Sequence, residues 1–144
     1  MRITSPPDLA VRLRLAITRT SRRLRQEAGT GLSPTLTAAL ATIDRHGPLT
    51  PSELAARERV QRPTATRLVA RLGELGMVQR AGDPVDRRSS LLTVTPQGRA
   101  LLEEMRGRKT AFLASRIEGL DADERAALDR AASILERLLE EDPA

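Results

Sequence analysis

The sequence predicts a mainly α-helical protein with a small β-wing of two or three strands, and three observations point to this fold class. Apolar residues recur at three- and four-residue steps over most of the chain, which is the helical period. Ser, Thr or Asp precedes several of these segments, as residues that start helices do. Only residues 77–94 have the pattern of two short strands around a turn. With 144 residues, we expect one domain that covers residues 1–144.

Two helices are predicted in the first third of the chain. Residues 1–7 contain two prolines and are expected to form a frayed or extended arm. The first helix covers residues 8–28 and ends at the glycines that follow it. Its periodic residues are Leu9, Leu13, Ile17, Thr20 and Leu24. The second helix begins with Ser33 as N-cap and Pro34 in the first turn, and it ends at the Gly-Pro pair at 47–48.

A helix-turn-helix pair is predicted next. Thr50 and Glu53 have the spacing of a capping box, so a helix begins here, and we expect it to stop near Arg59. The following helix runs over residues 63–75, where Gly76 favours a left-handed cap.

The two faces of the helix at 63–75 differ in composition. At 100° per residue, one side is apolar and is expected to face the core: Ala65, Leu68, Val69, Leu72 and Leu75. The opposite side holds Pro63, Thr66, Arg67 and Ala70. Small side chains on the outward face let a helix approach the floor of a groove in a binding partner. A helix that only covers a core tolerates long side chains on its outward face equally well.

The C-terminal half is predicted to contain a hairpin and two helices. The strands are residues 77–80 and 90–94. A helix then runs from the Thr-Pro pair at 95–96 to near Gly119, with these residues expected to be buried: Leu101, Leu102, Met105, Phe112 and Leu113. Asp121 and Glu124 repeat the capping-box spacing, and the last helix carries Leu128, Ala131, Leu135 and Leu138.

The charge is unevenly distributed along the chain, and its composition excludes several classes of function. Residues 61–99 carry seven basic and three acidic side chains, whereas residues 100–144 carry seven and eleven. A basic stretch at the predicted helix and hairpin is expected of a protein that neutralises phosphates. The absence of Cys excludes disulfides, thiolate metal sites and redox sensing by thiols. With a single His, no metal and no cofactor are expected.

The sequence does not suggest an enzyme or a membrane protein. It has no arrangement of nucleophile, base and orienting group, and no Gly-rich phosphate loop, so we expect no enzymatic activity. No apolar run approaches the roughly 20 residues that span a bilayer, and no signal peptide opens the chain, so a cytoplasmic protein is expected.

Residues 49–98 resemble the MarR family of bacterial regulators. The resemblance lies in ELA at 53–55, RPTATRLVARL at 62–72, LG with MVQR at 75–80, and the run Asp86, Arg87, Arg88 with Leu91, Leu92, Val94, Thr95 and Gly98. It implies a winged helix-turn-helix, residues 33–95, in a homodimer that is held together by helices at 8–28 and 96–142. One position departs from the usual pattern, because the turn before the second helix has Arg-Glu-Arg at 57–59 where Gly is common. In place of the usual glycine, we expect either a longer turn or a residue other than Gly in the left-handed conformation.

The resemblance also implies a function. The helix at 63–75 would enter the major groove of double-stranded DNA and the wing would lie over the neighbouring minor groove. We expect a repressor that binds a pseudo-palindromic operator. In this family a small molecule often lowers DNA affinity by binding between the dimer layer and the winged part, and the same release is expected here. A pocket in this chain would consist of aliphatic walls with Arg groups, since Phe112 is its only aromatic residue.

Seven residues are predicted to contact DNA. Arg62 and Arg67 can reach guanine edges or phosphates, and Thr64 and Thr66 have short hydroxyls for base edges or phosphates. Pro63 can pack against a thymine methyl. The alternatives are ordinary surface arginines, a helix-capping role for Thr64 and a helix-starting role for Pro63.

On the hairpin, Arg88 is the predicted minor-groove residue and Arg87 a phosphate contact. By the family resemblance, Asp86 would hold Arg88 in place and so stabilise the wing. Without that resemblance, the same three residues would be an ordinary solvated turn.

Two other functions remain open. The winged part could bind protein and the long helices could dimerise, in an interaction module without specific DNA recognition. A small, polar and basic outward face beside an Arg-tipped hairpin argues against this. A general DNA-packaging protein would bind with little sequence preference, which competition between specific and random duplexes would reveal.

Overall fold

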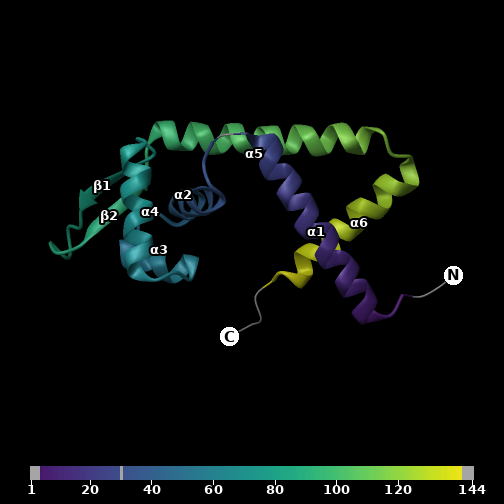
Figure 1. The fold of residues 1–144 in the computed structure, drawn as a ribbon, viewed down its shortest axis with the longest axis horizontal. Helices are drawn as coiled ribbons and strands as arrows, with labels where there is room; N and C mark the ends of the chain where they lie inside the picture. Colours follow the sequence, from purple (N-terminus) through teal and green to yellow (C-terminus); the bar gives the residue numbers. More distant parts are fainter. Residues whose placement is uncertain (1–3, 30, 141–144) are drawn as a thin grey trace. The chain divides into compact units, whose positions relative to one another are not determined.

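The computed structural model describes residues 4–29 and 31–140 (Figure 1). The elements, in chain order, are α1 (Pro6–Ala28), α2 (Pro34–His46), α3 (Pro51–Glu58), α4 (Arg62–Glu74), β1 (Val78–Gly82), β2 (Ser90–Val94), α5 (Pro96–Glu118) and α6 (Ala122–Leu138). The chain divides into two compact units, residues 1–109 and residues 110–144, and the long helix α5 contributes to both.

Local sequence signals place the starts of the helices. Ser33 accepts a hydrogen bond from the backbone N–H of Leu36 (3.2 Å), so the predicted start of α2 is confirmed. The prediction of an extended arm over residues 1–7 is wrong for residues 6 and 7, because α1 already begins at Pro6 with Ser5 as its N-cap. Proline is favoured in a first turn, where its missing N–H has no helical partner to lose. The first three residues of that arm lie outside the described part.

The helix-turn-helix forms with a non-glycine residue in its turn. At the start of α3, Thr50 Oγ1 accepts from Glu53 N (3.1 Å) and Glu53 Oε1 accepts from Thr50 N (3.3 Å), which is the predicted capping box. The helix ends at Arg59, whose φ of 54° is left-handed. Of the two alternatives expected for this turn, the residue other than Gly in the left-handed conformation is therefore confirmed. The next helix starts three residues later, at Arg62.

The core of the first unit lies between α2, α3, α4 and the sheet. Its buried members are Ala39, Leu40, Ile43, Leu49, Leu54, Val69, Leu72, Val78, Leu92, Val94 and Leu102. Strands β1 and β2 pair antiparallel, with Val78 opposite Val94 and Gly82 opposite Ser90. Leu49 forms an isolated bridge with Leu92, so the possible third strand is reduced to one residue pair.

The first half of α5 is fastened to the rest of the first unit at several points. A Cβ on Gly98 would lie 2.3 Å from the carbonyl oxygen of Met77, so only glycine lets the start of α5 approach this closely. Arg108 Nη1 donates to the carbonyl oxygen of Ala28 (2.9 Å) at the end of α1. Asp44 on α2 forms ion pairs with Arg99 (3.6 Å) and Arg106 (3.5 Å) on α5.

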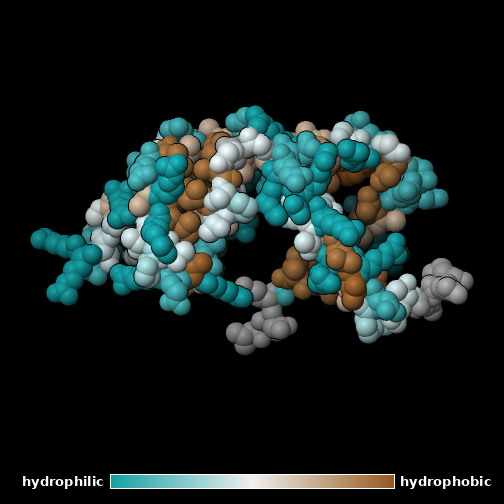
Figure 2. Space-filling model, in the orientation of Figure 1, coloured by the Kyte–Doolittle hydropathy of each residue, from teal (hydrophilic) through white to brown (hydrophobic). Residues whose placement is uncertain are grey.

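The predicted burial of the C-terminal helices is only partly correct. Leu102 and Met105 are buried and Leu101 and Phe112 are partly buried, but Leu113 is 36% exposed. The predicted capping box of α6 is present, yet no α6 residue within the described chain is buried. The apolar residues exposed on α1, α5 and α6 are Leu9, Val11, Leu15, Ile17, Leu113, Ile117, Leu128, Ile134 and Leu138. In Figure 2 the hydrophobic colour reaches the surface over these helices.

Candidate nucleic-acid interface

Helix α4 has an open N-terminus with a basic first turn. Its N-cap is Gln61, whose side chain makes no capping hydrogen bond. Arg62 and Pro63 occupy the first helical positions and are both exposed. The first N–H groups of a helix have no partner within it and carry partial positive charge, so this end of α4 suits a negatively charged group. Thr64 is not the helix cap, which removes one alternative for this residue.

The predicted division of α4 into two faces is confirmed. Ala65, Val69 and Leu72 are buried, and Leu68 and Leu75 are partly buried. The residues expected on the opposite face are all exposed: Pro63, Thr66, Arg67 and Ala70. Small or basic side chains therefore line the solvent side of the helix, and nothing in the described chain covers them.

The two threonines of α4 differ in their surroundings. Thr66 is exposed, but its hydroxyl donates to the carbonyl oxygen of Arg62 (3.0 Å), four residues earlier. The hydroxyl predicted to reach a base edge or phosphate is thus engaged within the helix. Thr64 is partly buried, so it presents less of its side chain to solvent.

The loop between the strands is held by hydrogen bonds from its backbone N–H groups, including that of Arg88, to two Asp side chains and to loop carbonyls. Asp86 Oδ1 accepts from the backbone N–H of Arg88 (3.0 Å), and the Asp86 carbonyl oxygen accepts from Ser89 N (3.1 Å). Asp83 Oδ1 accepts from Val85 N (2.9 Å). The carboxylate of Asp86 therefore bonds the backbone of Arg88, while the side chains of Arg87 and Arg88 are exposed.

The predicted DNA-contacting arginines form no ion pairs within the described chain. Within residues 4–29 and 31–140, no carboxylate lies within ion-pair distance of the four arginines in the predicted set: Arg62, Arg67, Arg87 and Arg88. By contrast, Arg71 pairs with Glu74 at 3.2 Å. Uncompensated guanidinium groups produce a positive potential that attracts phosphates.

One more exposed arginine without a carboxylate partner lies beside α4 and is not among the predicted contacts. Arg59 was interpreted only as a turn residue, yet it is exposed just before α4 and has no carboxylate partner in the described chain. The signal that indicates it is its position, because a basic residue in the turn of a helix-turn-helix lies next to the helix that is predicted to read DNA.

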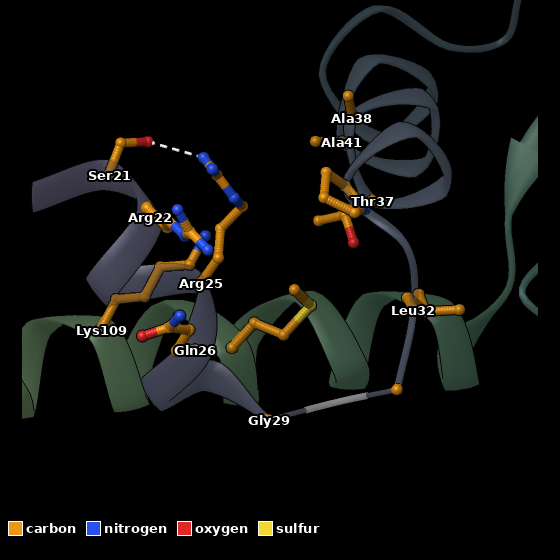
Figure 3. Close-up of a pocket in the computed structure, with 13 residues that line it drawn as sticks. Ser21, Arg22, Arg25, Gln26, Gly29, Leu32, Thr37, Ala38, Ala41 and Lys109 are labelled. Carbon is orange, nitrogen blue, oxygen red and sulfur yellow. Dashed lines mark hydrogen bonds between the residues drawn. The ribbon is translucent and has the colours of Figure 1, made fainter. Parts of the chain in front are cut away.

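A cavity of about 630 Å³ lies within the first unit, away from α4 and the hairpin (Figure 3). It is lined by residues of α1, α2, the loop between them and α5: Ser21, Arg22, Arg25, Gln26, Gly29, Gly31, Leu32, Pro34, Thr37, Ala38, Ala41, Met105 and Lys109. Figure 3 shows Arg22, Arg25 and Lys109 together on one side and Thr37, Ala38 and Ala41 across from them. Arg25 Nη1 donates to Ser21 Oγ (2.9 Å). The cavity thus has a cationic wall and an aliphatic wall.

The described residues contain no group of three or more His, Cys, Asp or Glu side chains that could hold a metal ion. A search of the same residues finds no helix with the length and hydropathy required to cross a bilayer.

Comparisons with known proteins assign the family. The MarR family model matches residues 32–90. An HTH-type transcriptional regulator of Mycobacterium tuberculosis (strain CDC 1551 / Oshkosh) is 37% identical over 142 residues, which is 98% of this chain and 99% of the relative.

Solved structures share the fold. A candidate transcriptional regulator of Pseudomonas aeruginosa superposes with a TM-score of 0.83 at 34% identity, covering 93% of this chain and 96% of that one. FabT of Streptococcus pneumoniae, crystallised in complex with DNA, has a TM-score of 0.69 at 22% identity, with 91% and 97% covered. The winged helix fold, the family match and the full-length relative agree: this chain belongs to the MarR family of transcription regulators.

Proposed function

We propose that this protein is a homodimeric regulator that binds a specific double-stranded DNA sequence through α4 and the β1–β2 wing. The observation that carries the proposal is the exposed face of α4, small and basic, together with an Arg-tipped hairpin in the same unit. FabT, which has the same fold, was crystallised in complex with DNA.

Helix α4 reads the major groove in this proposal. Arg62 and Arg67 reach guanine edges or phosphates, because both are exposed and unpaired within the described chain. Thr64 contributes at the edge of the contact, and Pro63 packs against a base methyl. The open N-terminus of α4 receives a backbone phosphate, since its amide groups have no side-chain cap.

The wing lies along the adjacent minor groove. Arg88 enters this groove, where a narrow A·T-rich segment concentrates negative potential, and Arg87 contacts a phosphate. Asp86 does not touch DNA. Its bond to the backbone N–H of Arg88 keeps the loop in the shape that presents both guanidinium groups.

The dimer is formed by residues 8–28 and 96–142, and residues 33–95 form the DNA-binding part. The support is the set of apolar side chains left exposed on α1, α5 and α6, because a second copy would cover them. Two-fold symmetry then places two copies of α4 about one helical turn apart, so the operator is an imperfect palindrome with half-sites about 10 base pairs apart.

We further propose that the protein acts as a repressor, since occupancy of a promoter alone is enough to exclude polymerase. Its effector is an anionic amphiphile that binds the 630 Å³ cavity, with the anion at Arg22, Arg25 and Lys109 and the apolar part against Leu32 and Met105. The volume is in the usual range for small-molecule sites. Release does not depend on thiol oxidation, because the chain has no Cys.

Selection of duplexes from a random library tests the proposal. The protein should enrich a palindromic sequence and bind it at least about a thousandfold more tightly than a scrambled duplex at physiological salt. Equal affinity for selected and scrambled duplexes would instead indicate a packaging protein. No binding to any duplex would favour the protein-interaction module, in which α4 and the wing contact a protein partner.

A further inference from the structure

The hydroxyl of Thr66 is used inside helix α4, although its side chain is exposed on the face that reads DNA. Thr66 Oγ1 donates to the carbonyl oxygen of Arg62 at 3.0 Å. This is a known arrangement for threonine within a helix, in which the side chain bonds the backbone four residues earlier. The inference that follows rests on the proposed DNA-reading role of α4.

The bond determines which group of Thr66 faces outward. The Cβ of threonine carries two heavy atoms, the hydroxyl and the γ-methyl, and within a helix only two rotamers are common for it. When the hydroxyl turns back to the Arg62 carbonyl, the methyl becomes the group that is available to a ligand. A hydroxyl that donated to a base would first have to give up an existing hydrogen bond.

The major groove contains one apolar group that such a methyl can recognise. Each base pair presents hydrogen-bond donors and acceptors there, and only thymine adds a 5-methyl group. The neighbours of Thr66 one turn away on the same face, Pro63 and Ala70, are exposed and have no side-chain hydrogen-bonding group, so they do not compete for a polar base edge. Arg62 and Arg67 supply the polar contacts beside it.

We propose that Thr66 is a specificity-determining residue that recognises a thymine in each half-site by methyl–methyl contact. Its hydroxyl donates within the helix and does not donate to a base or a phosphate. A guanine or cytosine at that position lacks the methyl, and so does uracil.

The experiment removes one methyl group from the DNA, by replacing thymine with deoxyuridine, and one from the protein, by Thr66→Ser. In the duplex selected by the parent protein, each symmetric pair of thymines is replaced in turn by deoxyuridine, which lacks only the 5-methyl group. Each duplex is titrated with the parent, Thr66→Val, which keeps the γ-methyl, and Thr66→Ser, which keeps the hydroxyl. Thr35→Val, at an exposed threonine of α2 outside α4 and the wing, is the matched control.

One thymine pair should stand out with the parent protein. Its replacement by deoxyuridine should weaken binding about fourfold per half-site, the loss expected for one buried methyl. Thr66→Val should show the same loss. Thr66→Ser should bind the thymine and deoxyuridine duplexes equally, at the weaker level. Thr35→Val should behave as the parent.

Two results would overturn the proposal. Thr66→Val binding as weakly as Thr66→Ser on the thymine duplex would show that the hydroxyl reads DNA. A parent protein indifferent to deoxyuridine at every position would show that no methyl is read. If the parent selects no duplex at all, the proposed function itself fails, and this result is distinct from the other two.

Discussion

At the scale of single residues, the arginines proposed to bind DNA make none of the contacts that engage three arginines of α5. Arg99 and Arg106 are engaged with Asp44, and Arg108 bonds the end of α1. Arg62 and Arg88 have no carboxylate within ion-pair distance in the described chain. Loss of an unpaired, exposed arginine should leave stability almost unchanged, so its effect on DNA binding can be measured without interference from unfolding.

Arg67→Ala and Arg88→Ala should weaken binding in different ways. Arg67→Ala should cost about 1–3 kcal/mol on the selected duplex and relax its base preference, because the major groove distinguishes all four base pairs. Arg88→Ala should weaken binding with only a mild change at A·T-rich flanks, because the minor groove code is degenerate. Titration of both variants against selected, flank-altered and scrambled duplexes measures this. If both bind all three duplexes like the parent, α4 and the wing are not the DNA-reading surface.

Asp86→Ala should act through the wing loop. The substitution removes the acceptor of the Arg88 N–H and so loosens the segment that carries Arg87 and Arg88. We expect weaker binding to selected and scrambled duplexes alike, with a melting temperature close to that of the parent, since the loop is exposed. Ser89→Ala, whose hydroxyl makes a longer 3.4 Å bond to the same carboxylate, should have a smaller effect. An effect of Ser89→Ala as large as that of Asp86→Ala would contradict this role.

At the scale of elements, the turn between α3 and α4 depends on a left-handed arginine. Arg59 has φ 54°, a conformation that costs a residue with a Cβ about 1–2 kcal/mol. Arg59→Gly should therefore raise the free energy of unfolding by about 0.5–1 kcal/mol, after the larger unfolded-state entropy of glycine is deducted. Arg59→Val should lower it, because β-branched residues fit this region poorly. Urea denaturation at fixed protein concentration measures both, and a destabilised glycine variant would contradict the assignment.

The ion pairs between α2 and α5 join the first helix of the winged part to the long helix. Asp44 is only 18% exposed and faces two arginines. Asp44→Asn keeps the size of the side chain but removes its charge, and should lower the free energy of unfolding by about 1 kcal/mol. Glu74→Gln is the control, because it breaks a pair with Arg71 on its own helix and joins no two elements. Equal stability of Asp44→Asn and the parent in urea would mean that these ion pairs do not fasten the two helices.

The sequence predicted those elements whose signals are local. The capping residues Thr50 and Glu53, and Asp121 with Glu124, are three residues apart, so the spacing alone places the helix starts. The two faces of α4 follow from its period, so the sequence alone identifies the exposed face of the candidate site.

What the sequence could not predict depends on contacts between distant segments. Asp44 and Arg106 are remote in the chain and their pairing arises only when α2 packs on α5. The cavity likewise combines residues of three helices. The prediction that Leu113 is buried was wrong. The helical period identifies an apolar face, but it does not show whether that face packs within the same chain or against another molecule. The Thr66 hydroxyl, finally, is engaged through a rotamer that the sequence does not specify.

At the scale of the whole molecule, the exposed apolar helices determine the expected assembly. Leu128 on α6 is 49% exposed, and a charged residue there would have to be buried in the proposed dimer. Leu128→Asp should therefore shift the sedimenting mass at micromolar concentration from the dimer towards the monomer of 15.7 kDa. Val85→Asp is the control, because Val85 is 95% exposed in the wing loop, outside the dimer helices. A parent protein that already sediments as a monomer would remove the dimer from the account.

Sedimentation of the protein with DNA tests the central claim most directly, because it reports specificity and assembly together. The selected duplex and a scrambled duplex of equal length are each mixed with the protein at physiological salt. The account predicts a complex of two protomers, each of 15.7 kDa, on the selected duplex and free DNA with the scrambled one. A complex with a single protomer, or equal loading of both duplexes, would contradict a dimer that reads a palindromic site through α4 and the wing.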